Sequence, residues 1–228
     1  MAQVDQFVLL DTVQFAKQSW QQRNRIKTPI GLQWLTVPVI FHGHFGQKIR
    51  DVRVREPEFA RSHLRAIELN YRRCSFFEQY YDSFAEVLRS NCSGLLAGLN
   101  YALIKWFLGI LNISVPLLCS SEIQVDGRRS ELLINICDTL GADESFSPLG
   151  SRSYLLDDSE LFERSGISVF FQNYTHPYYR QAFPPFCYYA SALDLIFNEG
   201  PDSRKVIESG RQELFTLEDV AEKSEVGS

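Results

Sequence analysis

Residues 158–172 have the sequence Asp-Ser-Glu-Leu-Phe-Glu-Arg-Ser-Gly-Ile-Ser-Val-Phe-Phe-Gln. The aspartates at 157 and 158 predict the N-terminal cap of a helix over 158–165, and Gly166 is typical of the residue that ends one. The apolar run 167–172 follows without a linker and predicts a buried strand. A helix that leads directly into a buried strand is the repeating unit of α/β folds.

The same alternation extends toward the N-terminus, with strands predicted at 115–119 and 145–147 and a helix at 130–140. The order strand, helix, strand, helix, strand gives parallel strands joined by right-handed crossovers. The remaining predictions are helices at 58–74, 76–89, 95–111 and 191–198 and strands at 7–10, 34–41 and 51–55. The helix at 95–111 is apolar nearly all round, so we expect it to be central.

These elements predict an α/β fold in a single domain, with a mixed sheet, a parallel βαβαβ C-terminal half and a helical middle. We expect this domain to occupy residues 1–215. The acidic segment 216–228 lacks a clear core-facing stripe, and we expect it to be disordered.

The composition narrows the class of protein. The 228 residues are 45% hydrophobic, 13% aromatic and 22% charged, which is typical of a globular domain and not of a disordered or fibrous chain. The net charge is −5, although residues 1–73 carry 12 basic and 6 acidic side chains. We therefore expect no nucleic-acid partner, whereas the basic N-terminal third suits a small anion.

Membrane, metal and disulfide signals are all weak. Lys105 interrupts the most apolar stretch, 94–118, so we expect a buried helix and strand there and no membrane span. The five cysteines lie far apart without a C-x-x-C pattern, and His42-Gly43-His44 has no supporting ligand, so we expect no metal. Scattered thiols favour a reducing compartment, and we expect a cytoplasmic protein.

Residues 11–26 carry the first candidate site. Asp11 lies at a predicted strand end, where ligands bind in α/β folds, and it is followed by cationic and amide side chains at Gln14, Lys17, Arg23, Asn24 and Arg25. Arginine and lysine bind phosphate or carboxylate, and the amides supply neutral hydrogen bonds. The alternative is a solvated basic segment that Phe15 and Trp20 anchor to the core.

Two turns after predicted strands are further candidates. Ser120-Ser121-Glu122 and Leu149-Gly150-Ser151 both offer backbone N–H groups and hydroxyls to an anion. Each has the composition of an ordinary turn as well.

Residues 170–190 form the densest candidate, with nine aromatic side chains, three prolines, His176 and Gln181. A histidine just after a strand can act as a general base near neutral pH. Tyrosines and prolines make rigid pocket walls that suit a sugar or a base. The alternative is a histidine that a backbone carbonyl holds beneath a stiff loop.

Several common motifs are missing from the chain. No G-x-G-x-x-G, P-loop, H-E-x-x-H or G-x-S-x-G occurs, which removes the usual support for dinucleotide enzymes, NTPases, zinc proteases and α/β-hydrolases. The sequence identifies no cofactor.

Taken together, the candidate segments resemble the WbqC-like family of bacterial O-antigen and polysaccharide gene clusters. The specific matches are the first, Phe7-Val-Leu-Leu-Asp11-Thr-Val-Gln14-Phe15-x-Lys17 continued by Trp20-x-x-Arg23-Asn24-Arg25-Ile26, and the last, Ser191-Ala-Leu-Asp194-Leu-Ile-Phe197-Asn198-Glu199-Gly200. A looser match is His176-Pro177-x-Tyr179-x-Gln181. Other looser matches lie between the first and the last, and the resemblance spans roughly residues 5–210 in unbroken order.

The resemblance implies transfer of glycine, or of another aminoacyl group, to an amino sugar of a surface polysaccharide. The acceptor would be nucleotide-linked or lipid-linked, and a charged tRNA remains open as donor. Catalytic roles are then expected for His176 as base, with Asp11 or Asp194 orienting it or binding the amine. Substrate binding is expected for Gln14, Lys17, Arg23, Asn24, Arg25, Ser121, Tyr179, Gln181 and Asn198. The alternatives are a non-catalytic sugar-nucleotide-binding or scaffolding protein and a truncated remnant.

The chain departs from the family pattern at two places. Members usually carry a strand and a Gln-Pro-x-Tyr-x-Pro-x-x-Gly-Tyr-Phe stretch before the segment that matches 4–11, and we expect this N-terminal strand and turn to be missing here. Pro148 stands in a turn where members have Ser-Gly, and it removes one backbone donor. We further expect one cleft to collect the charged candidates and the motif residues near them: Asp11, Lys17, Arg23, Asn24, His176 and Asp194.

Overall fold

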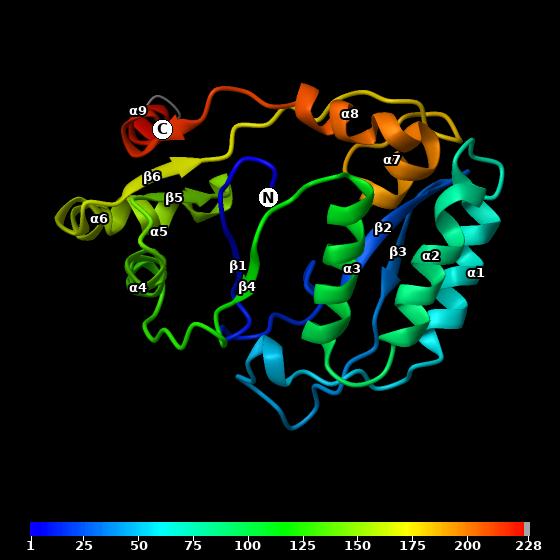
Figure 1. Ribbon diagram of the computed structural model, residues 1–228, viewed down its shortest axis with the longest axis horizontal. Coiled ribbons are helices and arrows are strands. Elements are labelled where there is room, and N and C mark those ends of the chain that lie inside the picture. The colour runs from blue at the N-terminus through cyan, green and yellow to red at the C-terminus, as the bar shows by residue number, and fades with distance from the viewer. Residues whose placement is uncertain (226–228) are drawn as a thin grey trace.

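The computed structural model describes the backbone of residues 1–225 and the side chains of residues 1–222 (Figure 1). The helices are α1 (Phe59–Tyr71), α2 (Phe77–Ser90), α3 (Leu96–Ile110), α4 (Ser130–Leu140), α5 (Arg152–Asp157), α6 (Ser159–Ser165), α7 (Ala192–Glu199), α8 (Ser203–Ser209) and α9 (Leu217–Glu225). The strands are β1 (Phe7–Leu9), β2 (Arg23–Thr28), β3 (Gly31–Thr36), β4 (Leu117–Cys119), β5 (Glu144–Ser147), β6 (Ser168–Phe171) and β7 (Phe215–Thr216). The predicted single-domain, mixed α/β class is confirmed.

The strands of the described residues form three small sheets. β5 and β6 are parallel, with α5 and α6 between them, and β7 adds to β6 in the antiparallel direction. The expected strand at 115–119 is present as β4, but it pairs in parallel with β1, with Leu9 opposite Cys119. The parallel unit predicted in the second half is thus shared with the N-terminus, and this pairing brings Asp11 beside Ser120.

The β2–β3 hairpin contains a strand that the sequence did not indicate. β2 begins at Arg23, within the basic segment 11–26 for which no strand was predicted, because its first residues are polar. In the structure Arg25 lies opposite Trp34 on β3, and the end of β2 is buried, with Ile26 1% exposed and Lys27 fully buried. The predicted strand at 51–55 is instead a 3-10 turn, Ile49–Asp51, followed by isolated bridges at Arg53 and Val54.

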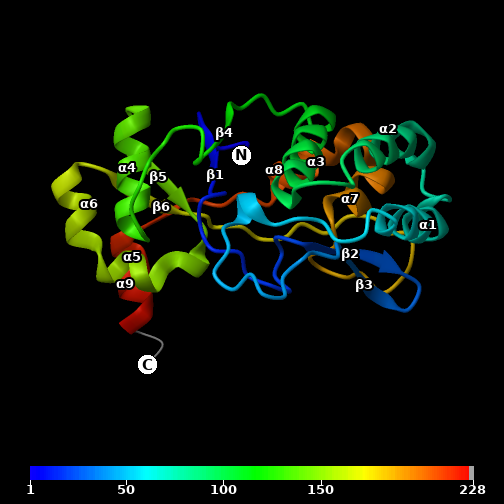
Figure 2. The same ribbon diagram turned by 90° about the horizontal axis from the view of Figure 1, so that it is seen from below.

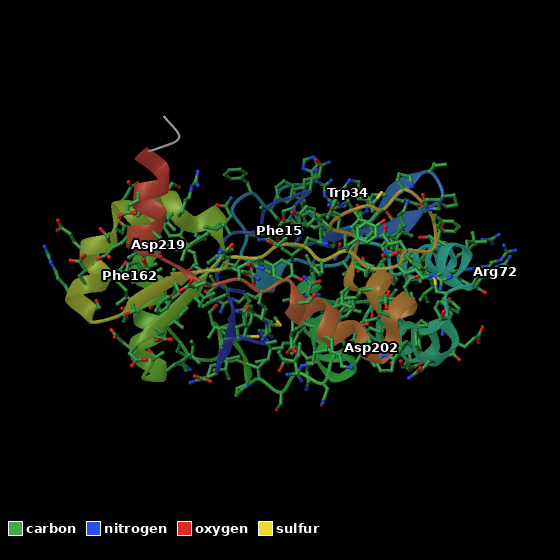
Figure 3. The ribbon with its side chains drawn as sticks, turned by 90° about the horizontal axis from the view of Figure 1, so that it is seen from above. Phe15, Trp34, Arg72, Phe162, Asp202 and Asp219 are labelled. Atoms are coloured by element: carbon green, nitrogen blue, oxygen red, sulfur yellow. The ribbon has the colours of Figure 1, made fainter. Side chains whose placement is uncertain are left out.

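Two hydrophobic cores lie on opposite sides of the β1–β4 pair (Figures 1 and 2). One packs α1, α2, α3 and α7 against the hairpin, through residues such as Ile67, Phe84 and Ile196. The other packs α4, α5, α6 and α9 around β5 and β6, with Phe162 at its centre. Figure 3 shows Phe162 toward one end of the molecule and Arg72, on the first group of helices, at the other. A small cluster of Phe15, Val52 and Leu96 lies apart from both.

The C-terminal segment differs from the expectation of disorder. Thr216 pairs in β7, and the Asp219 carboxylate accepts hydrogen bonds from the backbone N–H and the hydroxyl of Thr216 at 2.7 and 2.9 Å. Val220 on α9 is 2% exposed and belongs to the second core. The described part of 216–228 is therefore ordered where disorder was expected, because Leu217 and Val220 of α9 both pack against the second core. Residues 226–228 lie outside the described residues.

None of the helices within residues 1–225 combines the length and the apolar composition that a membrane crossing requires.

Candidate functional site

A cavity of about 510 Å³ lies between the β2–β3 hairpin and α3. Helices α1 and α2 contribute His63, Ile67, Phe84 and Leu88 to its wall, and β1, β4 and the start of α7 contribute residues at another side. Among the sequence-predicted site residues, Asp11, Arg23 and Asn24 line it. In Figure 1 the β1–β4 pair lies on one side of α3, and the hairpin is seen toward the other side.

Asp11 is held at the carboxyl ends of two parallel strands. It is 8% exposed, and its Oδ1 accepts hydrogen bonds from the Ser120 hydroxyl and from the Ser121 backbone N–H, both at 2.9 Å. Its Oδ2 accepts a bond from the Ser121 hydroxyl at 2.6 Å. Because β1 and β4 end at the same edge, two motifs about 110 positions apart in sequence meet here. Asp11 is thereby fixed in one orientation at the wall of the cavity.

Arg23 brings a positive charge to the same cavity. Its guanidinium carbon lies 4.2 Å from the centre of the Trp34 ring, and its buried Nε has no hydrogen-bond partner. No ion pair within the described residues includes Arg23. A guanidinium that is stacked on an aromatic ring and has no carboxylate partner is available to an anionic ligand.

The other polar residues of the first motif have different environments. Arg25 donates a hydrogen bond to the Tyr189 carbonyl oxygen at 3.2 Å and so joins the hairpin to the aromatic loop. The Asn24 side chain accepts from the Arg25 N–H at 2.8 Å. Lys17 is exposed, with its Nζ 5.2 Å from the Phe41 ring centre, and Gln14 is exposed beside Lys48. Neither Gln14 nor Lys17 lines the cavity, as far as the described residues show.

Asp194, on α7, is fully buried and anchors the aromatic loop. Its Oδ2 accepts hydrogen bonds from the Tyr179 hydroxyl at 2.8 Å and from Gln181 Nε2 at 2.9 Å. Gln181 also exchanges two hydrogen bonds with the backbone of Cys187, and Asn198 Nδ2 donates to the Asp194 backbone carbonyl. Burial raises the pKa of the Asp194 carboxyl, while its hydrogen bonds act in the opposite direction.

His176 is held by the backbone of the same loop. With a proton on Nδ1, the ring donates to the Pro177 carbonyl oxygen at 2.9 Å, and its Nε2 accepts the Tyr189 N–H at 3.3 Å. Aromatic rings surround it, including Tyr188 at 5.4 Å and Tyr189 at 5.1 Å between ring centres. This arrangement matches the structural alternative for His176, because neither ring nitrogen is free to take a proton from a substrate.

The expected convergence of six residues on one cleft is therefore only partial. The cavity wall includes Asp11, Arg23 and Asn24, with Ser121 bonded to Asp11. Among the described residues of that wall, Lys17, His176 and Asp194 are missing. They were grouped because each follows a predicted strand or lies on the closing helix. However, the loop 174–190 folds onto α7 through Asp194 and so forms a separate cluster.

Two further titratable groups lie near these clusters: His63, for which the sequence favoured a packed or solvated role, and Lys27, which the sequence analysis did not single out. His63 lines the cavity from α1, and burial lowers its pKa to about 4. Lys27 is fully buried at the end of β2; its backbone N–H donates to the Tyr71 hydroxyl at 2.7 Å, and its ammonium donates to the Thr28 carbonyl at 3.2 Å. Their positions in the sequence could have indicated that the core encloses them. Lys27 directly follows the apolar Ile26, and His63 lies one turn before Ile67 on an apolar helix face.

Across the described residues, no group of three or more histidine, cysteine, aspartate or glutamate side chains is placed to hold a metal ion.

Comparison with known proteins gives two matches that span nearly the whole chain. A family model described as the WbqC-like protein family matches residues 1–206. The chain is also 35% identical over 213 residues to "Uncharacterized protein Rv1507c" of Mycobacterium tuberculosis (strain ATCC 25618 / H37Rv), covering 93% of this chain and 91% of that protein. No solved structure gives a significant match. The resemblance predicted from the motifs is confirmed.

Proposed function

Since this chain belongs to the WbqC-like protein family, we propose that it transfers an aminoacyl group to the amino group of a sugar. By the resemblance, the group is glycine and the product serves O-antigen or related surface-polysaccharide biosynthesis. The five cysteines are all free thiols, which supports a reducing, cytoplasmic setting for this reaction.

One observation carries the proposal: a fixed carboxylate and an unpaired guanidinium line the same cavity. Asp11 is oriented by three hydrogen bonds, and Arg23 has an unpartnered, buried Nε. A sugar that bears both an amine and a phosphate presents charges opposite to these two groups. Asp11 would receive the amine, and Arg23 would receive the phosphate.

The chemistry needs a deprotonated amine and a stabilised tetrahedral intermediate. The Asp11 carboxylate takes a proton from the sugar ammonium. The free amine then attacks the carbonyl carbon of an activated aminoacyl donor, so that a C–N bond forms and the bond to the leaving group breaks. The leaving group departs with its electron pair and takes up the second proton that the amine nitrogen must lose to form the amide. Asp11 replaces His176 as the base in this proposal, because both ring nitrogens of His176 bind the backbone.

The direct test is a transfer assay. The purified chain is incubated with nucleotide-linked or lipid-linked amino sugars and either glycine with ATP or glycyl-tRNA, and products are detected by mass spectrometry. We expect one acceptor to gain a single glycyl group, and we expect Asp11→Asn to abolish the gain. Asp82→Asn, an exposed change on α2, is the matched control. Ligand binding with no product from any donor would instead support the non-catalytic alternative.

A further inference from the structure

The cavity that Asp11 lines has two chemically different parts. Toward β1, β4 and the start of the hairpin its wall is polar, with Asp11, Arg23, Asn24 and Asn100. Its remaining wall is mostly hydrocarbon, with Ile67, Phe84, Leu88, Leu103 and Phe107 as examples, although Gln21, Gln22, His63 and Ser191 also line it. We call these two parts the polar mouth and the apolar chamber.

Part of the chamber wall belongs to the helical core. Ile67, Leu88 and Phe84 are 1%, 3% and 4% exposed. On α3 the lining residues are Ala97, Asn100, Leu103, Ile104 and Phe107, a spacing that places them on one face of the helix. At 1.5 Å per residue this stripe, which includes Asn100 of the polar mouth, is about 15 Å long. The cavity as a whole is therefore elongated along α3.

A hydrogen bond links the two elements on either side of the polar mouth. Asn100 Nδ2, on the α3 stripe, donates a hydrogen bond to the Gln21 carbonyl oxygen at 2.8 Å, which ties α3 to the start of the hairpin. Trp20 and Trp34 are 60% and 40% exposed, their rings lie 5.0 Å apart, and Arg23 stacks on Trp34. The guanidinium thus lies at the boundary between the chamber and solvent.

The titratable group within the chamber wall is His63, and it adds no charge near neutral pH. Burial lowers its pKa to about 4, so that the imidazole is uncharged there. The chamber offers few partners for the hydrogen-bonding edges of a nucleobase, whose burial without partners is costly. A hydrocarbon chain needs no partners and gains from leaving water.

We propose that the apolar chamber holds an alkyl or prenyl chain whose terminal phosphate binds Arg23, so that the acceptor is lipid-linked and not nucleotide-linked. The identity of the sugar rests on the proposed function. The chain-binding site does not, because it follows from the chamber and Arg23 alone.

The test measures affinities of a series of n-alkyl phosphates below their micellar concentrations. Hexyl, octyl and decyl phosphate are titrated into the full chain and followed by calorimetry, with inorganic phosphate and uridine diphosphate as comparisons. We expect the affinity to rise about fourfold per methylene until the chamber is full, and uridine diphosphate to bind more weakly than decyl phosphate. Equal affinity for all chain lengths, or tighter binding of uridine diphosphate, would overturn the proposal.

Two substitutions on α3 locate the chain. Leu103→Phe narrows the chamber, and we expect it to lower the chain length at which the affinity stops rising. Ile110→Phe adds the same type of side chain to the same helix outside the cavity wall and should leave the series unchanged. If Leu103→Phe does not fold, Leu103→Asn places an amide in the chamber and should weaken decyl phosphate binding at least tenfold. If both Leu103 variants and the unmodified chain showed the same affinities across the alkyl phosphate series, the alkyl chain would not lie in the chamber, and the proposed site would be wrong.

Arg23 and Asp11 separate this inference from the proposed transfer reaction. Arg23→Gln should weaken the binding of every alkyl phosphate by a similar factor, and the gain in affinity per methylene should stay the same. Asp11→Asn should retain the alkyl phosphate series even though it abolishes transfer. Glycyl transfer to a nucleotide-linked sugar, together with a flat alkyl series, would refute the lipid chain and leave the transferase proposal standing.

Discussion

Asp11 and Asp194 are both buried carboxylates in the two most specific motifs of the chain, yet their surroundings differ. Asp11 accepts three hydrogen bonds from Ser120 and Ser121 and still lines the cavity. Asp194 is fully buried and ties Tyr179 and Gln181 to α7. A motif aspartate can thus be a ligand-facing group or a loop anchor, and only its solvent access distinguishes the two.

The two histidines repeat this contrast. His63 lies in the cavity wall, although its position on a predicted helix favoured a packed or solvated histidine. His176 lies in a matched motif, yet its ring bonds only to the backbone of its own loop. Motif membership therefore marks residues that hold the fold together as well as residues that line the cavity.

The largest expected effect is on transfer activity at Asp11. Asp11→Asn keeps the shape and the hydrogen-bonding oxygen but removes the base, and we expect the rate to fall roughly 10²- to 10⁴-fold. The comparison is Asp194→Asn, measured per folded molecule in the same assay. Equal losses from both substitutions would break the distinction between a ligand-facing carboxylate and an anchor.

The next effect is on stability at Asp194. Asp194→Ala leaves the buried Tyr179 hydroxyl without its acceptor, whereas Gln181 keeps the Cys187 carbonyl oxygen, and an unsatisfied buried group costs about 1–3 kcal/mol. We expect a loss of about 1–3 kcal/mol in the free energy of unfolding by urea denaturation. Asp11→Ala should cost less, because the buried Ser120 hydroxyl keeps the Thr12 hydroxyl as a partner at 2.8 Å and Ser121 is only half-buried. A larger loss at Asp11 would reverse the comparison.

A third effect is the pH dependence that His63 confers. Its folded-state pKa is lowered to about 4, whereas an unfolded histidine titrates near 6.5. The folded protein therefore binds a proton at His63 more weakly than the unfolded chain does. The stability that the neutral imidazole contributes is present above about pH 6.5 and is lost as the pH falls toward 4. Between pH 7 and pH 4 the free energy of unfolding of the native chain should fall by about 3 kcal/mol more than that of the His63→Gln variant. If the free energy of unfolding of the two proteins changed equally with pH, the lowered pKa of His63 would be contradicted.

The smallest effect is expected at His176. His176→Ala removes two hydrogen bonds to the loop backbone, each contributing about 1 kcal/mol. We expect a lower melting temperature and a rate per folded molecule within about threefold of the native chain. A loss of activity similar to that of Asp11→Asn, with no change in melting temperature, would restore His176 as the base.

Much of the helical half was predictable from local pattern. The helices expected at 58–74, 76–89 and 95–111 correspond to α1, α2 and α3, with bounds that differ by up to three residues. Their apolar spacing is a local property, and each helix satisfies its own backbone hydrogen bonds. The strands were harder, because β2 begins with three polar residues and is recognised only through its pairing with β3.

The kinds of residue in the candidate site were predictable from the sequence, but which individual residues line the cavity was only partly predictable. Asp11 and Ser121 were chosen independently because each follows a strand, and the β1–β4 pairing brings them into hydrogen-bond contact. Lys27 was missed, because nothing in a run of basic residues indicates which one the core will enclose. Gln14 and Lys17 were included by proximity in sequence, yet they lie outside the cavity wall that the described residues form.

The sequence by itself determined the mixed α/β class, the family and the positions of most helices, because composition, motifs and helical periodicity are carried by neighbouring residues. The tertiary structure decided which strands pair, where the cavity lies and whether an aspartate or a histidine faces it. Those features depend on contacts between segments more than 100 positions apart, as in the bond between Asp11 and Ser121. The free energy of such contacts comes from burial and hydrogen bonding that exist only once both segments have folded.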